Sequence, residues 1–160
     1  QSLGLVETFG AALMSCSMIG NICTKLVIGF LSDRLGPVKA NLVMMGTNAA
    51  SILVLMAGTR AGTTSLLIAA FLFGSVFAVA AVGIPLLTRY FFGNEHYAKA
   101  YAVIGFFTSV GSSSSLAVIG YLYDLFGTYQ YAFAAAVCFL LVNSLLLLGA
   151  VVLKNRRAVA

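Results

Sequence analysis

Charge is scarce in this sequence of 160 residues: only 8% of them are Asp, Glu, Lys or Arg, whereas 61% are hydrophobic. A soluble domain carries about a quarter charged residues, because water must solvate its whole surface. The scarcity of charge therefore excludes most soluble folds. Acidic residues number four and histidine one. So few proton-transferring and metal-ligating groups leave little material for an enzyme site.

The charged residues that are present lie in clusters separated by long uncharged runs. The uncharged runs are 20 residues long between Lys39 and Arg60, 28 between Arg60 and Arg89, 24 between Lys99 and Asp124, and 29 between Asp124 and Lys154. A helix needs about 20 apolar residues to cross a hydrocarbon core of about 30 Å. We therefore expect an all-α, polytopic membrane bundle with five transmembrane helices, at about 5–31, 38–57, 64–89, 98–123 and 129–154.

The basic residues are distributed unevenly between the two ends of these helices. With segment 32–39 on the cytoplasmic side, that side carries Arg34, Lys39, Arg89, Lys99, Lys154, Arg156 and Arg157. The opposite side carries Arg60 alone. This positive-inside bias predicts a multi-pass protein of the cell membrane, with the N-terminus of this chain outside and its C-terminus in the cytoplasm. Topology thus accounts for the net charge of +5, and we expect no nucleic-acid partner.

Lys25 is the one charged residue in the interior of an expected span, away from the span ends. A lysine at the membrane centre costs about 2.5 to 3.5 kcal/mol on insertion scales, so it has a partner, a water-filled cavity or a route to the interface. Asn21 lies one turn earlier on the same face. The pair can cradle a carboxylate. Alternatively, Lys25 extends along the helix to the inner interface and Asn21 hydrogen-bonds to another helix.

Two further features interrupt the apolar helices. Gly83-Ile84-Pro85 lies near the inner end of the third span, where the proline removes a backbone hydrogen bond and predicts a kink. The fourth span contains a hydroxyl cluster from Thr108 to Ser115. Two stripes of this cluster can line a hydrated path, Thr108/Ser112/Ser115 or Ser109/Ser112/Ser113, and Ser112 belongs to both. Small residues at a tight helix crossing are the other interpretation of this cluster.

Enzymatic chemistry has no visible site in the sequence. The only histidine, His96, has Glu95 as a neighbour in the chain but no second ligand at helical spacing. The chain shows no Ser/His/Asp set, no paired carboxylates inside a span and no phosphate-binding glycine loop. We therefore predict no enzyme activity, no cofactor and no metal site.

The first helical hairpin carries a recognisable motif. Gly29-Phe30-Leu31-Ser32-Asp33-Arg34-Leu35-Gly36 resembles the G-x-L-[AS]-D-R-x-G signature of major facilitator superfamily transporters, and the run from Gly120 to Tyr129 is similar to a junction before the last helix of that family's C-terminal half. The resemblance implies helices 8 to 12 of a twelve-helix carrier that works by alternating access. The N-terminal half of the same carrier is then missing here, and Gly29, Asp33, Arg34 and Gly36 form a gating motif.

Within that superfamily the chain resembles the monocarboxylate and oxalate/formate transporter-like group. Members of this group tend to carry a cation four residues before the motif glycine, and Lys25 stands four before Gly29. The resemblance implies a small organic anion as substrate, bound by Lys25 with Asn21 beside it. From the hydroxyl cluster we expect Ser112 to belong to the same substrate site, and we expect symport or antiport as the coupling. The fourth span lacks the second interior cation of the oxalate type. An exporter of hydrophobic compounds and a structural membrane protein without transport activity are the alternatives.

Overall fold

The computed structural model describes residues 7–57 and 62–159, with side chains from 9–57 and 62–156. Every regular element within these residues is a helix, which confirms the all-α prediction. Four of the helices are long and apolar enough to cross a membrane. The chain is therefore a polytopic membrane bundle. Residues 5 and 6 of the first expected helix, Arg60, and the side chain of Arg157 lie outside the described part.

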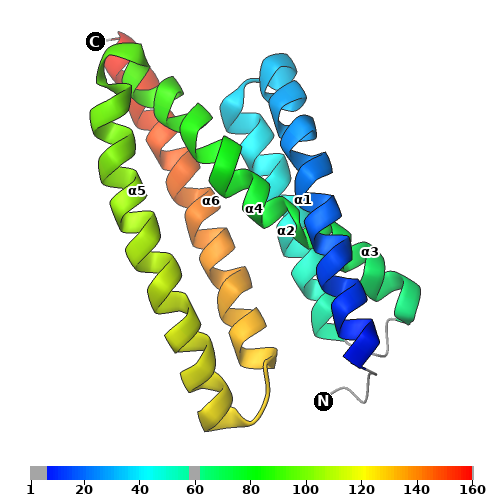
Figure 1. The fold of residues 1–160 in the computed structure, drawn as a ribbon. Helices are drawn as coiled ribbons and strands as arrows, with labels where there is room; N and C mark the ends of the chain where they lie inside the picture. The colour runs from blue at the N-terminus through cyan, green and yellow to red at the C-terminus, as the bar shows by residue number, and fades with distance from the viewer. Residues whose placement is uncertain (1–6, 58–61, 160) are drawn as a thin grey trace. The chain divides into compact units, whose positions relative to one another are not determined.

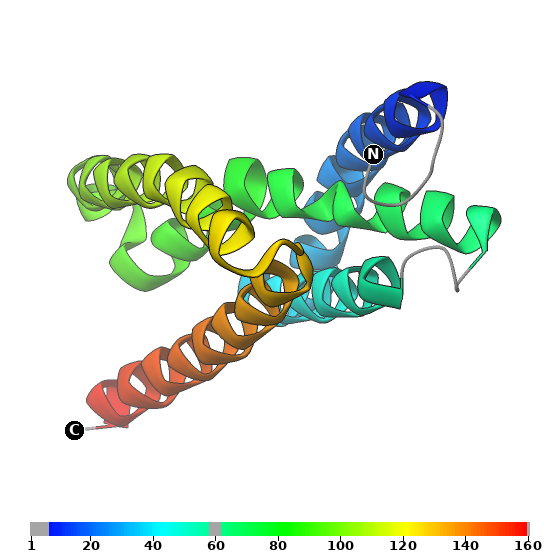
Figure 2. The same cartoon turned by 90° about the horizontal axis from the view of Figure 1, so that it is seen from below.

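The elements follow one another with short connections (Figures 1 and 2). In chain order they are α1 (Glu7–Leu35), α2 (Pro37–Ala57), α3 (Thr63–Phe73), α4 (Ser75–Ala78), the π-helix η2 (Val79–Gly83), α5 (Ile84–Phe126) and α6 (Gln130–Val159). Helix α1 runs one turn beyond the expected end at residue 31, because the helix terminates only where Gly36 takes a positive φ of 86°. Pro37 then opens α2, where its missing N–H is harmless.

The third and fourth expected spans form one continuous apolar segment, Thr63–Phe126, of 64 residues. A straight helix of that length would measure about 96 Å, three times the thickness of a hydrocarbon core. The break is Gly93, whose φ of 70° and ψ of 180° are not helical. The sequence predicts a connection over 90–97, whereas the structure keeps the flanking residues helical and turns the chain at this single glycine (Figure 1).

The chain divides into two compact units, Gln1–Leu86 and Leu87–Ala160. In the first unit, α1 and α2 pack against α3, α4 and η2. Ile28, Ala40 and Met44 form a buried apolar cluster, with Val79 and Val82 against it. A second set of buried residues in this unit is polar: Ser17, Ser32, Asn41, Asn48, Ser51 and Ser75. Buried amides and hydroxyls need hydrogen-bond partners, and inside a membrane protein these come from neighbouring helices.

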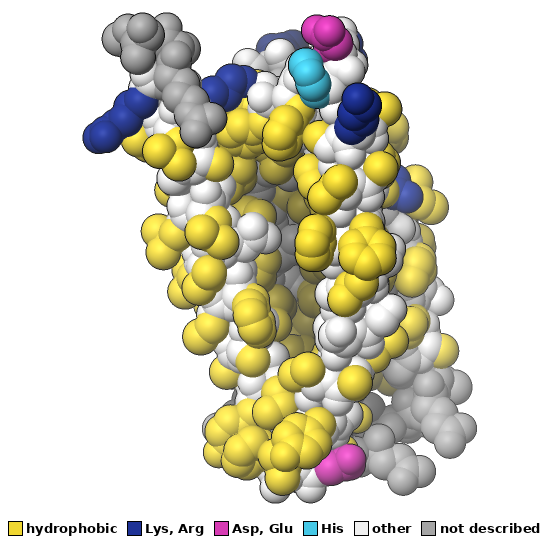
Figure 3. Space-filling view, turned by 90° about the vertical axis from the view of Figure 1, so that its left-hand side faces the viewer, with side chains coloured by type: hydrophobic (Ala, Val, Ile, Leu, Met, Phe, Trp, Pro, Cys, Tyr) yellow, Lys and Arg dark blue, Asp and Glu magenta, His cyan; other side chains and the backbone are white. Residues whose placement is uncertain are grey.

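The second unit is a helical hairpin, in which α5 and α6 are joined at Gly127, with a φ of 65°. Its side chains are mostly exposed, and Leu147 is the buried apolar residue of α6 within the described part. The space-filling view shows hydrophobic side chains along the middle of the helices and charged ones gathered near their ends (Figure 3). This distribution is the one that a bilayer requires, since lipid tails solvate the apolar middle.

Candidate functional site

Helix α2 contributes a buried polar face to the first unit. The single hydroxyl proton of Ser75 is shared between two acceptors, Asn48 Oδ1 and the carbonyl oxygen of Leu72, the latter at 2.6 Å. One turn further along α2, the hydroxyl of Ser51 donates to the carbonyl oxygen of Ala69 at 2.7 Å. These bonds join α2 to α3 and α4 in the interior, where no water competes for them.

Helix α1 crosses α3 and α4 with almost no side chain between the backbones. A Cβ atom at Gly20 would collide with the carbonyl oxygen of Phe71. A Cβ atom at Gly74 would collide with the carbonyl oxygen of Ser17 and would lie 2.5 Å from the backbone nitrogen of Asn21. Both glycines are therefore needed for this close approach. The crossing fixes the part of α1 that carries the predicted substrate residues.

Asn21 lies directly at this crossing and is half-buried. Its Oδ1 atom is buried and has no hydrogen-bond partner among the described residues. A buried acceptor without a partner costs about 1 to 3 kcal/mol.

Lys25 lies one turn beyond Asn21 on α1, and its side chain is exposed on the first unit. The structure thus places the cation and the unpartnered amide on one helix face, at the i, i+4 spacing that the sequence predicts. Asp33 lies eight residues further along the same helix, about 12 Å by the helical rise. The two expected roles of Lys25, in a cavity and at the interface, both stay predictions.

The gating motif forms a tight helix–glycine–helix corner. The Gly36 N–H donates to the carbonyl oxygen of Ser32 at 2.9 Å, and the Ala40 N–H donates to the carbonyl oxygen of Gly36 at 3.1 Å. Asp33 and Arg34 are exposed, and the Arg34 guanidinium lies 4.8 Å from the ring centroid of Phe30. The corner therefore presents one carboxylate and one guanidinium outward. Gly29, a turn earlier, has open space around it.

The expected kink region around Gly83 and Pro85 contains the π-helical turn Val79–Gly83. There the N–H of Ile84 donates to the carbonyl oxygen of Val79, five residues back, and the next residue, Pro85, has no N–H to donate. Asn41 of α2 lies against this turn. Its Nδ2 atom donates to the carbonyl oxygens of Pro37 at 2.8 Å and Gly83 at 3.4 Å.

Ser112 belongs to the second unit, on the exposed surface of α5. Its hydroxyl donates to the carbonyl oxygen of Ser109 at 2.9 Å, and Thr108 and Ser114 likewise donate to carbonyl oxygens one turn back. These hydroxyls are therefore satisfied by their own helix. Whether Ser112 meets the same substrate as Lys25 stays a prediction.

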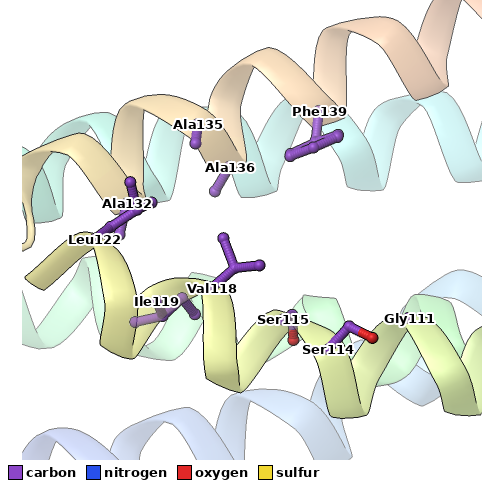
Figure 4. Close-up of a pocket in the computed structure, with 10 residues that line it drawn as sticks. All are labelled: Gly111, Ser114, Ser115, Val118, Ile119, Leu122, Ala132, Ala135, Ala136 and Phe139. Atoms are coloured by element: carbon purple, nitrogen blue, oxygen red, sulfur yellow. The ribbon is translucent and has the colours of Figure 1, made fainter.

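A groove of 490 Å³ lies between α5 and α6 (Figure 4). Its lining is almost wholly apolar, and residues from both helices point into it: Gly111, Ser114, Ser115, Val118, Ile119, Leu122, Ala132, Ala135, Ala136 and Phe139. From the hydroxyl cluster of α5, the structure brings Ser114 and Ser115 to this groove rather than Ser112.

A comparison with protein-family models matches residues 1–160 to the Major Facilitator Superfamily. The chain belongs to the Major Facilitator Superfamily. Members of this superfamily are membrane transporters, so the coarse function expected from the hairpin motif is confirmed. Neither the curated proteins nor the solved structures gave a match.

The most buried polar residues of this superfamily member are ones that the sequence analysis did not single out. Asn41, Asn48 and Ser51 repeat at intervals of seven and three residues, so they share one face of α2. This spacing of polar residues within an apolar span is the pattern that would have indicated a buried polar face on α2. No group of three His, Cys, Asp or Glu residues in the described ranges is placed to hold a metal ion.

Proposed function

We propose that this chain is part of a secondary carrier for a small, monocarboxylate-like organic anion, with Lys25 as the anion anchor. The observation that supports it is the exposed ammonium of Lys25, which lies one turn from Asn21 on the same face of α1. A carboxylate accepts hydrogen bonds from the Lys25 ammonium and the Asn21 Nδ2 group.

The same proposal assigns roles to the other predicted residues. Ser112 contributes a hydroxyl to the substrate site from α5. Asp33 and Arg34, presented outward by the Gly36 corner, act as a gate element when two six-helix halves rock about a midplane site. A carboxylate such as Asp33 is stabilised against the positive N-terminus of a helix, which favours the inward-closed state. The N-terminal half of the carrier completes the cavity, and transport is coupled to protons or to exchange.

Replacing Lys25 tests the anion anchor. In the full-length carrier, Lys25→Ala is expected to reduce uptake of radiolabelled formate or lactate to background, because the carboxylate loses the ammonium that anchors it. Uptake is measured in vesicles with equal amounts of membrane-inserted protein. The matched control is Lys39→Ala, which removes an exposed lysine from α2 and should leave uptake within about twofold. Normal carboxylate uptake by Lys25→Ala would remove the organic-anion assignment.

A second candidate is an exporter of hydrophobic compounds, which the apolar groove of the second unit favours. In that case Lys25 extends to the inner interface and does not touch the substrate. Cells that express the full-length carrier would then resist toxic hydrophobic compounds, and Lys25→Ala would leave that resistance unchanged. The Lys25→Ala variant thus separates the two candidates in one pair of assays.

A further inference from the structure

A second cavity lies at the C-terminal end of the α5–α6 hairpin. It has a volume of 470 Å³ and is lined by Phe91 and Phe92 from α5 and by Ala150, Leu153 and Lys154 from α6. All five residues belong to the second unit. Four of them are apolar, and Lys154 brings a positive charge. The cavity therefore combines an apolar wall with a cationic group.

The ammonium of Lys154 is held in a defined position. It donates a hydrogen bond to the carbonyl oxygen of Tyr90 and lies 3.7 Å from the ring centroid of Tyr90 and 5.6 Å from that of Phe91. Because an ammonium has three N–H donors, the bond to Tyr90 leaves two for an anion. The contacts with the ring faces orient the cation without neutralising it.

The position of Lys154 in the sequence sets its depth in the membrane. It ends a run of 29 uncharged residues that begins after Asp124, and exposed Arg156 follows two residues later. Exposed Arg89 precedes Tyr90 in the chain, and its Nε atom donates to Asn94 Oδ1 at 2.6 Å. Three basic residues at the end of an apolar span lie at the level of the lipid headgroups.

We propose that this cavity binds one anionic phospholipid, with the phosphate accepting hydrogen bonds from Lys154 and the glycerol and upper acyl chain packing on Phe91, Phe92 and Leu153. Charge complementarity selects the anionic headgroup. The apolar wall selects a lipid over a free phosphate ion, since only the lipid covers it.

This site is distinct from the apolar groove in Figure 4. Along α6, Lys154 and Phe139 are separated by 15 residues, which corresponds to about 22 Å. One leaflet of the hydrocarbon core is only about 15 Å thick. An acyl chain that starts at Lys154 therefore ends before it reaches that groove, and the lipid site is independent of any occupant there.

Lipid titration of the full-length carrier in neutral detergent tests the proposal. Phosphatidylglycerol and phosphatidylcholine with identical acyl chains are added, and bound lipid is counted by native mass spectrometry while the melting temperature is followed. We expect phosphatidylglycerol to bind more tightly and to raise the melting temperature further. Lys154→Gln should weaken phosphatidylglycerol binding about fivefold, the effect of one basic residue near an anionic lipid surface. Equal binding of the two lipids by the wild-type carrier would overturn the proposal.

Three controls assign the source of any effect. Lys99→Gln removes an exposed lysine of the same unit and should leave the preference for phosphatidylglycerol unchanged. Lys154→Arg keeps the positive charge at position 154 and should also keep this preference. Inorganic phosphate and soluble glycerol phosphate should bind weakly. Binding of either as tightly as the lipid would identify a free-phosphate site and overturn the lipid assignment. The wild-type comparison of the two lipids decides the proposal even where Lys154→Gln fails to fold.

Discussion

At the scale of single residues, the interior of the first unit depends on amides and hydroxyls whose partners come from other helices. Asn48 is 2% exposed and Ser75 is 1% exposed, and they bond to each other between α2 and α4. An interior pair of this kind has no water to replace a missing partner. Its two members should therefore be energetically coupled.

Removing either member of this pair should destabilise the protein, and removing both should cost less than the sum. Ser75→Ala leaves the buried Oδ1 of Asn48 without its donor, an expected loss of about 1 to 3 kcal/mol. Asn48→Ala removes the acceptor, while Ser75 retains its bond to Leu72. Thermal unfolding of the single and double variants in detergent gives the coupling energy. Strictly additive losses would show that the two side chains do not stabilise each other.

The sequence identified charged residues far better than buried amides. Lys25, Asp33 and Arg34 stand out because any charge near an apolar span is expensive and conspicuous. Asn41 and Asn48 carry no charge and resemble ordinary polar interruptions of a helix. Their importance depends on which face α2 turns toward η2 and α4, and that direction is set by packing rather than by their own residue type.

At the scale of the elements, the buried side chain of Asn41 on α2 packs closely against the π-helix η2. Asn41 is 0% exposed, and its Oδ1 atom has no hydrogen-bond partner in the described structure. This atom occupies the space where a side chain at Gly83 would project. Glycine is thus required at that position by the contact with α2, in addition to the backbone adjustment before Pro85.

Gly83→Ala should therefore destabilise the protein by about 1 to 3 kcal/mol, as expected when an extra methyl group is forced into a packed interior. The double variant Gly83→Ala/Asn41→Ala should recover part of this loss, because the colliding Oδ1 atom is gone. Gly149→Ala is the matched control, since its helix position on α6 has open space, and it should be neutral or slightly stabilising. A Gly83→Ala variant as stable as Gly149→Ala would contradict the steric match.

The limits of the helices were predictable only where a chemical signal marks them. Gly36-Pro37 ends one helix and begins the next, as the residue types favour. The connection predicted over 90–97 contracts to the single residue Gly93, because the polar residues around it are still compatible with a helix and only glycine readily adopts its positive φ. The π-helical turn carries no residue pattern of its own beyond the nearby proline, so the sequence predicts a kink but not its geometry.

At the scale of the whole molecule, membrane solvation determined what could be predicted. Lipid requires long apolar helices, and charge marks their ends, so the all-α bundle followed from the spacing of thirteen charged residues. The superfamily match confirms a transporter. Substrate selection depends on a few side chains that meet in a cavity, and residue spacing along one chain does not specify which helix faces converge there.

The uneven distribution of basic residues predicts how the whole chain is oriented in the membrane. Seven basic residues are expected on one side against Arg60 on the other, so residues near Lys39 and Lys154 should face the cytoplasm and the α5–α6 turn at Thr128 should face outside. Single cysteines are introduced at these three positions after the native Cys16, Cys23 and Cys138 are replaced by alanine. In intact cells a membrane-impermeant maleimide should label Thr128→Cys alone.

Permeabilised cells supply the control for this measurement, because all three cysteines should then react. An unchanged melting temperature of the parent that lacks Cys16, Cys23 and Cys138 shows that the replacements keep the carrier folded. Labelling of Lys39→Cys or Lys154→Cys in intact cells would contradict the predicted orientation and place Asp33 on the outer side. The lipid site at Lys154 would then meet the outer leaflet, and its preference for an anionic headgroup would have to be tested against the lipids of that leaflet.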